Sequence, residues 1–174
     1  MENCVVIYKS KTGFTEKYAN WIAEELGCEA FPLENVNHLE LSEYDLIIYG
    51  SGVRAGKMSG ISFVNKNRIT FPNKKLVIFA TGATPVDESD AIERVRTMNV
   101  PKNSHIPFFY FQSGFNYEGM KGLDKLLMSM VRGMMQRAKD KDGTQDGMAD
   151  AMKNSYDHSS RESIEPLVSY VKSL

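Results

Sequence analysis

The strongest limit on the fold of this chain comes from five short apolar runs. They lie at residues 5–8, 29–33, 46–49, 76–80 and 106–111. Together they are built mainly from Val, Ile, Leu, Phe and Tyr without polar alternation, which is typical of strands buried on both faces of a parallel sheet. Stretches of helical period lie at residues 16–26, 61–67, 88–98 and 161–173. This order predicts an α/β fold with a three-layer, doubly wound, five-stranded parallel sheet.

The composition is that of an ordinary globular protein. With 174 residues, 42% hydrophobic and 25% charged, we expect a single domain over residues 1–174 with an insertion after strand five at about 115–160. Lysine and arginine (21) balance aspartate and glutamate (22), so no global field favours nucleic acid or a basic protein partner. No segment reaches the roughly 18 apolar residues of a membrane span, and no basic, apolar leader opens the chain, so we expect a cytoplasmic protein.

The sequence offers no pattern for a disulfide or a metal site. Cys4 and Cys28 form neither a CxxC pair nor a disulfide framework, and we expect buried free thiols. The three histidines lack ligand spacing. The segment at residues 142–150 imitates the start of a calcium-binding loop, but Lys153 stands where the bidentate glutamate should be. A solvated loop is the better interpretation of that segment.

A hexad rich in hydroxyls, SKTGFT at residues 10–15, joins the first apolar run to the first helical stretch. A helix N-terminus exposes unpaired N–H groups and the positive end of the helix dipole, so it readily holds an anion. Ser10, Thr12 and Thr15 add hydroxyl donors, while Gly13 permits a close backbone approach. The hexad therefore predicts a phosphate site. The alternative is an ordinary turn in which Thr15 caps the helix. A Walker A loop is excluded because the sequence contains no G-x-x-x-x-G-K-[ST] pattern.

The ordered pattern S-x-T-G-x-T after the first strand resembles the phosphate loop of the flavodoxin family, [ST]-x-T-G-x-T. Ser10, Thr12, Gly13 and Thr15 match it position by position, and the resemblance extends through all five expected strands. It implies the strand order 2-1-3-4-5 and an FMN cofactor whose terminal phosphate lies in this loop. It also implies that the flavin ring lies between the loops after strands three and four, at residues 49–60 and 80–89.

Both ring loops are rich in small residues, which suits a backbone that approaches a flat ring. By the resemblance, the residues expected to hold FMN are Ser10, Lys11, Thr12, Gly13, Phe14, Thr15, Ser51, Gly52, Val53, Arg54, Ala55, Thr81, Gly82, Ala83 and Thr84. Arg54 beside the flavin N1 and C2 carbonyl would stabilise the negative charge of the reduced flavin; the alternative is a solvated arginine. The segment GSGVRAG at residues 50–56 is similar to a dinucleotide fingerprint, but it is one residue too long and follows the third strand, which disfavours a nicotinamide site.

The insertion at about 115–160 contains a long stretch of helical period. Over residues 117–141, Met and Leu side chains fall on one side of a projected helix, and Lys, Arg and Gln side chains fall on the other. The apolar arc is about 200° wide, more than the ~100° stripe of one packing surface, which predicts a second contact. The occupants left open are the insertion's own domain, a quinone, a porphyrin, a second subunit of a homo-oligomer, and a membrane surface touched peripherally.

The Met-rich insertion, the first ring loop and the terminal RESIEPLVSYVKSL resemble the flavodoxin-domain branch that contains the menaquinone-dependent protoporphyrinogen IX dehydrogenase. This implies an FMN-binding oxidoreductase that passes electrons to a quinone. Two departures from flavodoxin electron carriers agree with it: the net charge is only −1, and residues 51–58 and 82–86 contain no aromatic side chain. The alternatives are a small electron-transfer protein that docks on a redox partner, and a non-catalytic binding module on the same fold.

Overall fold

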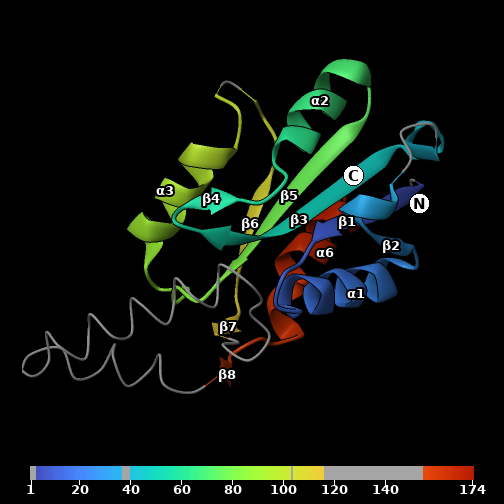
Figure 1. The fold of residues 1–174 in the computed structure, drawn as a ribbon. Helices are drawn as coiled ribbons and strands as arrows, with labels where there is room; N and C mark the ends of the chain where they lie inside the picture. Colours follow the sequence, from blue (N-terminus) through green and yellow to red (C-terminus); the bar gives the residue numbers. More distant parts are fainter. Residues whose placement is uncertain (1–2, 37–39, 103, 116–154) are drawn as a thin grey trace, which may run out of the picture. The chain divides into compact units, whose positions relative to one another are not determined.

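The computed structural model describes residues 3–36, 40–102, 104–115 and 155–174. The chain divides into two compact units, one made of Met1–Ser113 with Ser159–Leu174 and the other of Gly114–His158. The first unit contains the main sheet, shown in Figure 1, and all the residues that we expect to hold the cofactor.

Five parallel strands form the main sheet, in the order β2-β1-β3-β5-β6. They are β1 (Cys4–Lys9), β2 (Glu29–Pro32), β3 (Leu46–Arg54), β5 (Lys75–Gly82) and β6 (Phe108–Gln112). Among the five expected strands this order is 2-1-3-4-5, so the predicted fold class and strand order are confirmed. A two-residue strand that was not predicted, β4 (Lys57–Met58), pairs antiparallel with β3. Because the five strands are parallel, the segments after β1, β3 and β5 all leave the same edge of the sheet.

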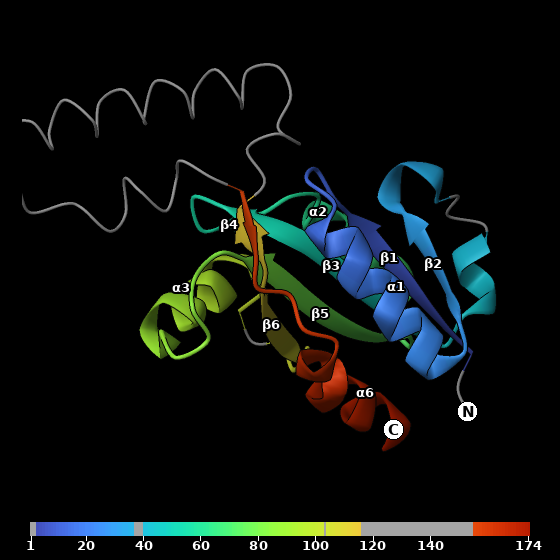
Figure 2. The ribbon, with the colours of Figure 1, turned by 90° about the horizontal axis from the view of Figure 1, so that it is seen from below.

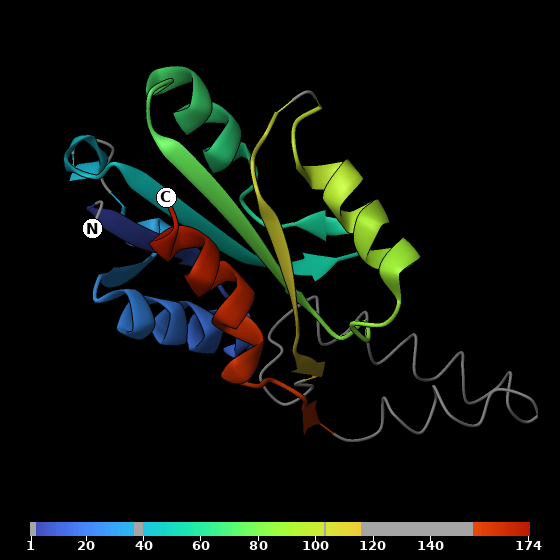
Figure 3. The same cartoon turned by 180° about the vertical axis from the view of Figure 1, so that it is seen from behind.

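Helices cover both faces of this sheet, as Figures 2 and 3 show. One face carries α1 (Phe14–Leu26) and α6 (Glu165–Lys172). The other carries α2 (Ser62–Thr70) and α3 (Ser89–Asn99). The helix expected at residues 161–173 opens with a short 3-10 helix, Glu162–Ile164, before α6 begins. Two further 3-10 helices, Leu33–Asn35 and Glu40–Glu43, lie between β2 and β3.

Each face of the sheet has its own apolar core. Val6 and Ile48 pack on the side of α1 and α6, whereas Ile7 and Ile47 pack on the side of α2 and α3. All four side chains are fully buried, and complete burial of such a side chain stabilises the fold by about 1.5–3 kcal/mol. Burial on both faces is the reason why these strands contain no polar alternation.

The two cysteines are neighbours at the start of β1 and β2. Val5 pairs with Glu29 in the sheet, so Cys4 and Cys28 occupy the preceding positions. Both thiols are free, as expected, but Cys28 is only half-buried because β2 is the edge strand. A hydrogen bond with Cys4, followed by burial, raises the pKa of the Cys28 thiol above its usual range. The neutral thiol is therefore favoured over the reactive thiolate.

In the second unit, the structure describes one short antiparallel pair, β7 (Gly114–Phe115) with β8 (Tyr156–Asp157). The ring of Tyr156 lies 5.1 Å from the ring of His158. The predicted Met-rich helix and the calcium-like segment fall within residues 116–154, outside the described part of the chain.

Candidate functional site

Three of the predicted segments meet at the edge where the parallel strands end. Gly52 of β3 and Thr81 of β5 are register partners, and Ser51 pairs with Lys9 at the end of β1. The buried hydroxyls of Thr15 and Thr81 share a 2.8 Å hydrogen bond. A Cβ added to Gly52 would lie 3.6 Å from Thr15 Oγ1 and 3.9 Å from Thr81 Oγ1. The start of α1 and the ends of β3 and β5 are thus in direct contact.

Thr15 does not cap α1, so the alternative interpretation of the hexad as a simple capping turn is wrong. The N-cap residue is Gly13, and no side chain caps the helix. Thr15 is the second helical residue and uses its hydroxyl on Thr81 instead. The helix α1 therefore begins at the sheet edge with an N-cap residue that offers no side-chain cap to its first N–H groups.

The backbone at Gly13 is left-handed and open. Its φ is 92°, a value that L side chains rarely adopt, and no atom lies within 4 Å of the position that a Cβ would take. The Gly13 N–H donates to Ser10 Oγ at 3.2 Å, which closes the loop between β1 and α1. An exposed backbone at the positive end of a helix is the setting in which helix N-termini hold phosphate groups.

A carboxylate lies in the first turn of α1, at Glu16. The Tyr8 hydroxyl donates to Glu16 Oε1 at 2.9 Å, which ties this negative charge to β1. Burial, and then the hydrogen bond to Glu16, raises the pKa of Tyr8 to about 12. Tyr8 is therefore a protonated donor at neutral pH and restrains the side chain that would repel an anion at this helix end.

The segment expected to be a loop after the third strand is a β-hairpin. β3 continues to Arg54, and the turn at Ala55 and Gly56 leads into β4. Both turn residues have positive φ, 48° and 78°, as in a two-residue type I′ turn. The loop interpretation of residues 49–60 is therefore wrong for four predicted site residues. Ser51 and Gly52 continue the parallel pairing of β3 with its neighbours in the main sheet, and Val53 and Arg54 pair with β4.

The loop expected after the fourth predicted strand also begins later than predicted. Thr81 and Gly82 belong to β5, while Ala83 and Thr84 follow it. The hydroxyl of Tyr110, on β6, donates to the Thr84 carbonyl oxygen at 3.1 Å. A Cβ on Gly82 would lie 2.6 Å from that hydroxyl, so the tyrosine requires glycine there. Tyr110 was not predicted as a site residue, because in the sequence it is one more aromatic residue of an apolar strand.

Alternation along β3 separates the predicted residues of the hairpin. Ser51 lies on the side of Tyr49, whose hydroxyl donates to the Ser59 carbonyl oxygen at 2.5 Å. The Ser51 hydroxyl is completely buried, and the Tyr49 hydroxyl is its polar neighbour. These two hydroxyls do not meet the geometry of a hydrogen bond, and no other described residue forms one with Ser51. Arg54 lies two residues beyond Gly52 on the opposite side and is exposed at the hairpin end.

The residues at this sheet edge fit FMN. The open backbone of Gly13 suits the phosphate, and bare Gly52 beside Thr15 and Thr81 suits a close approach of the ring. The buried Ser51 hydroxyl has hydrogen-bonding capacity that the described residues do not use. Of the other predicted residues, Lys11, Ala55 and Ala83 are exposed, and Thr12, Phe14 and Val53 are half-buried. Their contact with a cofactor stays a prediction.

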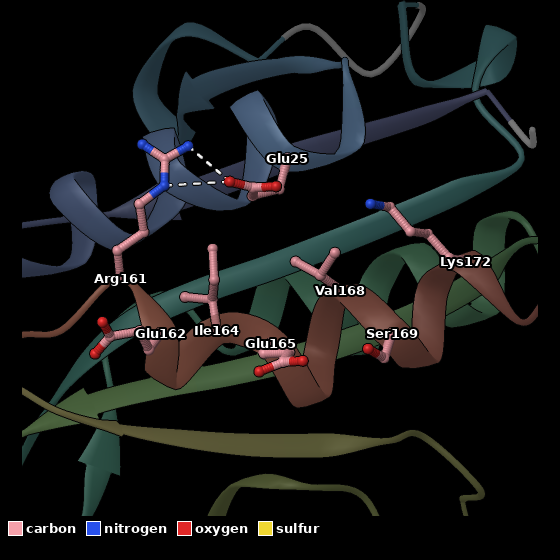
Figure 4. A pocket seen from close by; sticks show the side chains of 8 residues that line it. All are labelled: Glu25, Arg161, Glu162, Ile164, Glu165, Val168, Ser169 and Lys172. Carbon is pink, nitrogen blue, oxygen red and sulfur yellow. Dashed lines mark hydrogen bonds and ion pairs between the residues drawn. The ribbon is translucent and has the colours of Figure 1, made fainter.

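A separate groove of about 470 Å³ lies between α1 and α6, shown in Figure 4. Its lining includes Arg161, whose guanidinium group binds Glu24 and Glu25 at 2.8 Å each. None of the predicted cofactor residues lines this groove, and Arg161 is already paired with two carboxylates. We therefore assign the candidate site to the sheet edge and not to this groove.

The described residues contain neither a metal-binding cluster nor a membrane-spanning helix. Among them, no cluster of three or more histidine, cysteine, aspartate or glutamate side chains could hold a metal ion. Within the same part of the chain, no helix combines the length and the apolar character that a membrane crossing demands.

The chain is similar to several proteins in sequence or in fold. An uncharacterized protein of Methanocaldococcus jannaschii is 37% identical over 82 residues, which span 47% of this chain and about half (55%) of that protein. The WrbA-like flavodoxin of Agrobacterium tumefaciens is 18% identical, with a TM-score of 0.46 over 82% of this chain and 100% of that one. A flavoprotein of Lactobacillus acidophilus in complex with FMN is 14% identical, with a TM-score of 0.43 over 64% and 93%.

The family assignment rests on a family model, described as a flavodoxin domain (Flavodoxin_5), which matches residues 5–142. That range includes the loop at residues 10–15, the β3–β4 hairpin and the end of β5. Since the match covers well over half of the sequence, the chain belongs to the flavodoxin domain family.

Proposed function

We propose that this chain is an FMN-dependent oxidoreductase that passes electrons to a quinone. Membership of the flavodoxin domain family supports FMN as the cofactor. The observation that carries the proposal is the buried Thr15–Thr81 hydrogen bond beside Gly52. It joins the helix end suited to a phosphate to the strand ends suited to a flat ring.

When bound, FMN supplies the reversible uptake and release of electrons. The chain's own residues would bind and orient it. The backbone from Gly13 to Thr15 would hold the phosphate at the positive end of α1. Gly52 would admit the ring edge, and the buried Ser51 hydroxyl, for which the described residues supply no partner in hydrogen-bonding geometry, would form a hydrogen bond with a polar atom of the cofactor. Arg54 would place a positive charge near the charge that develops on reduction.

The finer assignment is to the protoporphyrinogen dehydrogenase type. It is supported by the net charge of −1 and by the absence of aromatic side chains from residues 51–58 and 82–86, which leaves a flavin face open to a second reactant. Contact with a quinone, a second subunit or a membrane surface through the insertion belongs to the same proposal. The alternative is an electron carrier without a substrate of its own.

The first experiment examines the purified full chain. Flavin absorption bands at about 370 and about 450 nm are expected, and mass spectrometry of the released cofactor should identify FMN and not FAD. Steady-state turnover is then measured with a menaquinone analogue and with a small soluble acceptor. The oxidoreductase proposal expects turnover with the quinone. A flavin-loaded protein that reduces only the soluble acceptor would favour the carrier.

A second experiment replaces residues 118–158 by a short Gly/Ser linker. The predicted cofactor residues lie elsewhere in the chain, so FMN should remain bound while quinone turnover is lost. Turnover with the small soluble acceptor serves as the internal control for the same variant. Unchanged quinone turnover in the FMN-loaded deletion would contradict a role of the insertion in the reaction.

A further inference from the structure

A buried amide side chain links the β3–β4 hairpin to the end of α3. Asn99 is only 6% exposed, and all of its described hydrogen bonds go to the backbone. The Met58 N–H donates to Asn99 Oδ1 at 2.8 Å, and Asn99 Nδ2 donates to the Gly56 carbonyl oxygen at 2.7 Å. The same Nδ2 donates to the Val95 carbonyl oxygen, one helical turn earlier, also at 2.7 Å. One side chain therefore holds both the turn and the returning strand of the hairpin.

The neighbouring residue of α3 adds a second contact with the same turn. A Cβ on Gly56 would lie 2.9 Å from the sulfur of Met98, so the helix end and the turn are closely packed. Figures 1 and 3 show β4 beside α3. β4 itself contributes only two paired residues, and such a short antiparallel pair is not stable on its own. The position of the hairpin end thus depends on α3.

We propose that Asn99 is a positioning residue for the flavin site. Its amide holds the β3–β4 hairpin against α3 and thereby sets the position of Ser51 to Ala55, the segment expected to lie along the flavin ring. The inference rests on the proposed function, because it assigns to Asn99 the support of that same site. Asn99 itself does not contact the cofactor in this proposal.

The physical reason is the cost of unsatisfied backbone groups. Without the amide, the Met58 N–H and the Gly56 carbonyl oxygen lose their partners in a largely buried place, and the hairpin must shift to hydrate them. A shift of about 1 Å in a supporting segment is enough to impair a site that depends on precise placement. The effect should therefore be seen at the cofactor and not only in global stability.

The chain offers a matched control in Asn67 of α2. Asn67 is 1% exposed, and its Nδ2 donates to the Phe63 carbonyl oxygen at 2.9 Å, one helical turn earlier, as Asn99 does to Val95. Asn67 has no described bond to the hairpin. Asn99→Leu and Asn67→Leu thus remove the same kind of intrahelical bond, and only the first removes the contacts with β4 and its turn.

The experiment measures amide hydrogen exchange at Met58 and the binding of FMN to the full chain. In Asn99→Leu, we expect exchange at Met58 to be at least about tenfold faster, the FMN affinity to fall about tenfold, and the potential of the bound flavin to shift. Asn67→Leu should leave all three at the wild-type values. If Asn99→Leu does not fold, Asn99→Asp provides the test, since it keeps the acceptor for Met58 and loses both donors; intermediate effects are expected.

Two results would overturn the proposal. The first is unchanged exchange at Met58 in Asn99→Leu. The second is a loss of FMN affinity in Asn99→Leu that Asn67→Leu reproduces, because the effect would then be general destabilisation. A wild-type chain that binds no FMN would contradict the proposed function instead, and the Met58 exchange would still decide whether Asn99 holds the hairpin.

Discussion

The loop at residues 10–15 and the β3–β4 hairpin reach the same edge of the sheet by different means. In the loop, the support is local: Gly13 turns the chain at φ 92°, and its N–H bonds Ser10 Oγ three residues earlier. In the hairpin, the support comes from far along the chain, because Asn99 bonds Gly56 and Met58 from a separation of more than forty residues. A locally made bend leaves a motif in the sequence, whereas a bend held from a distance does not.

The largest expected effect tests the local side of this comparison. Gly13→Ala meets no steric clash, but it forces an alanine into a left-handed backbone conformation, which costs about 1–2 kcal/mol. The loop should change shape to relieve this strain. We expect FMN affinity to fall about tenfold or more. Gly27→Ala is the control, since Gly27 has φ 64° and equally open space at the other end of α1. It should cost similar stability in urea unfolding and leave FMN binding intact; equal losses of binding would break the comparison.

A pH effect compares the tyrosines that support the two regions. Burial raises the pKa of both Tyr8 and Tyr49, with the bond to Glu16 adding to the effect at Tyr8. In the unfolded chain both titrate near about 10, so between about pH 10 and 12 the unfolded state loses protons that the folded state keeps. The stability from these groups is present below about pH 10 and is lost as the pH rises.

Urea unfolding at about pH 8 and about pH 11 measures this loss. Tyr8→Phe and Tyr49→Phe should each show a smaller difference between the two pH values than the wild type. The reduction should be similar in the two variants, because both phenols stay largely protonated at about pH 11 in the folded chain and the loss is set by their common titration in the unfolded chain. A wild-type pH dependence in both variants would show that these phenols titrate normally in the folded chain.

A smaller effect is expected at the hairpin end. Arg54 is exposed, so solvent screens its charge, and its stabilisation of the reduced flavin should be about 1 kcal/mol, or about 20 mV for a two-electron couple. Arg54→Ala should therefore lower the flavin potential by that amount in potentiometry. Lys57→Ala, at the register partner, is the control and should shift the potential less. Equal shifts would indicate a general charge effect of the hairpin.

The smallest effect tests the turn itself. Ala55 has φ 48°, and Ala55→Asn would produce Asn-Gly, the dipeptide preferred in type I′ turns. Asparagine tolerates the left-handed conformation better than alanine does. We expect a gain of about 0.5–1 kcal/mol in the free energy of unfolding, measured by urea denaturation. A lower stability would mean that the turn differs from type I′ in solution.

The same contrast explains which features the sequence could predict. Uninterrupted apolar runs identified the five main strands, since burial on both faces leaves a clear pattern, whereas their order was predicted from the resemblance to the flavodoxin family. The hexad at residues 10–15 identified a bend that its own residues make. The prediction of a loop at the hairpin was wrong because a Gly-rich segment is also typical of loops. Asn99 and Tyr110 could not be predicted, because nothing in the sequence around either residue indicates the distant carbonyl oxygen to which it donates.

The central claim is that the loop at residues 10–15 holds the phosphate of FMN, and the most direct test compares FMN with riboflavin, which lacks the phosphate. Fluorescence titration gives both affinities for the wild type and for a Thr12→Ala, Thr15→Ala double variant. We predict that the wild type binds FMN at least about a hundredfold more tightly than riboflavin, and that the double variant loses most of this ratio. Equal affinities for the two ligands in the wild type, or an unchanged ratio in the double variant, would contradict the account.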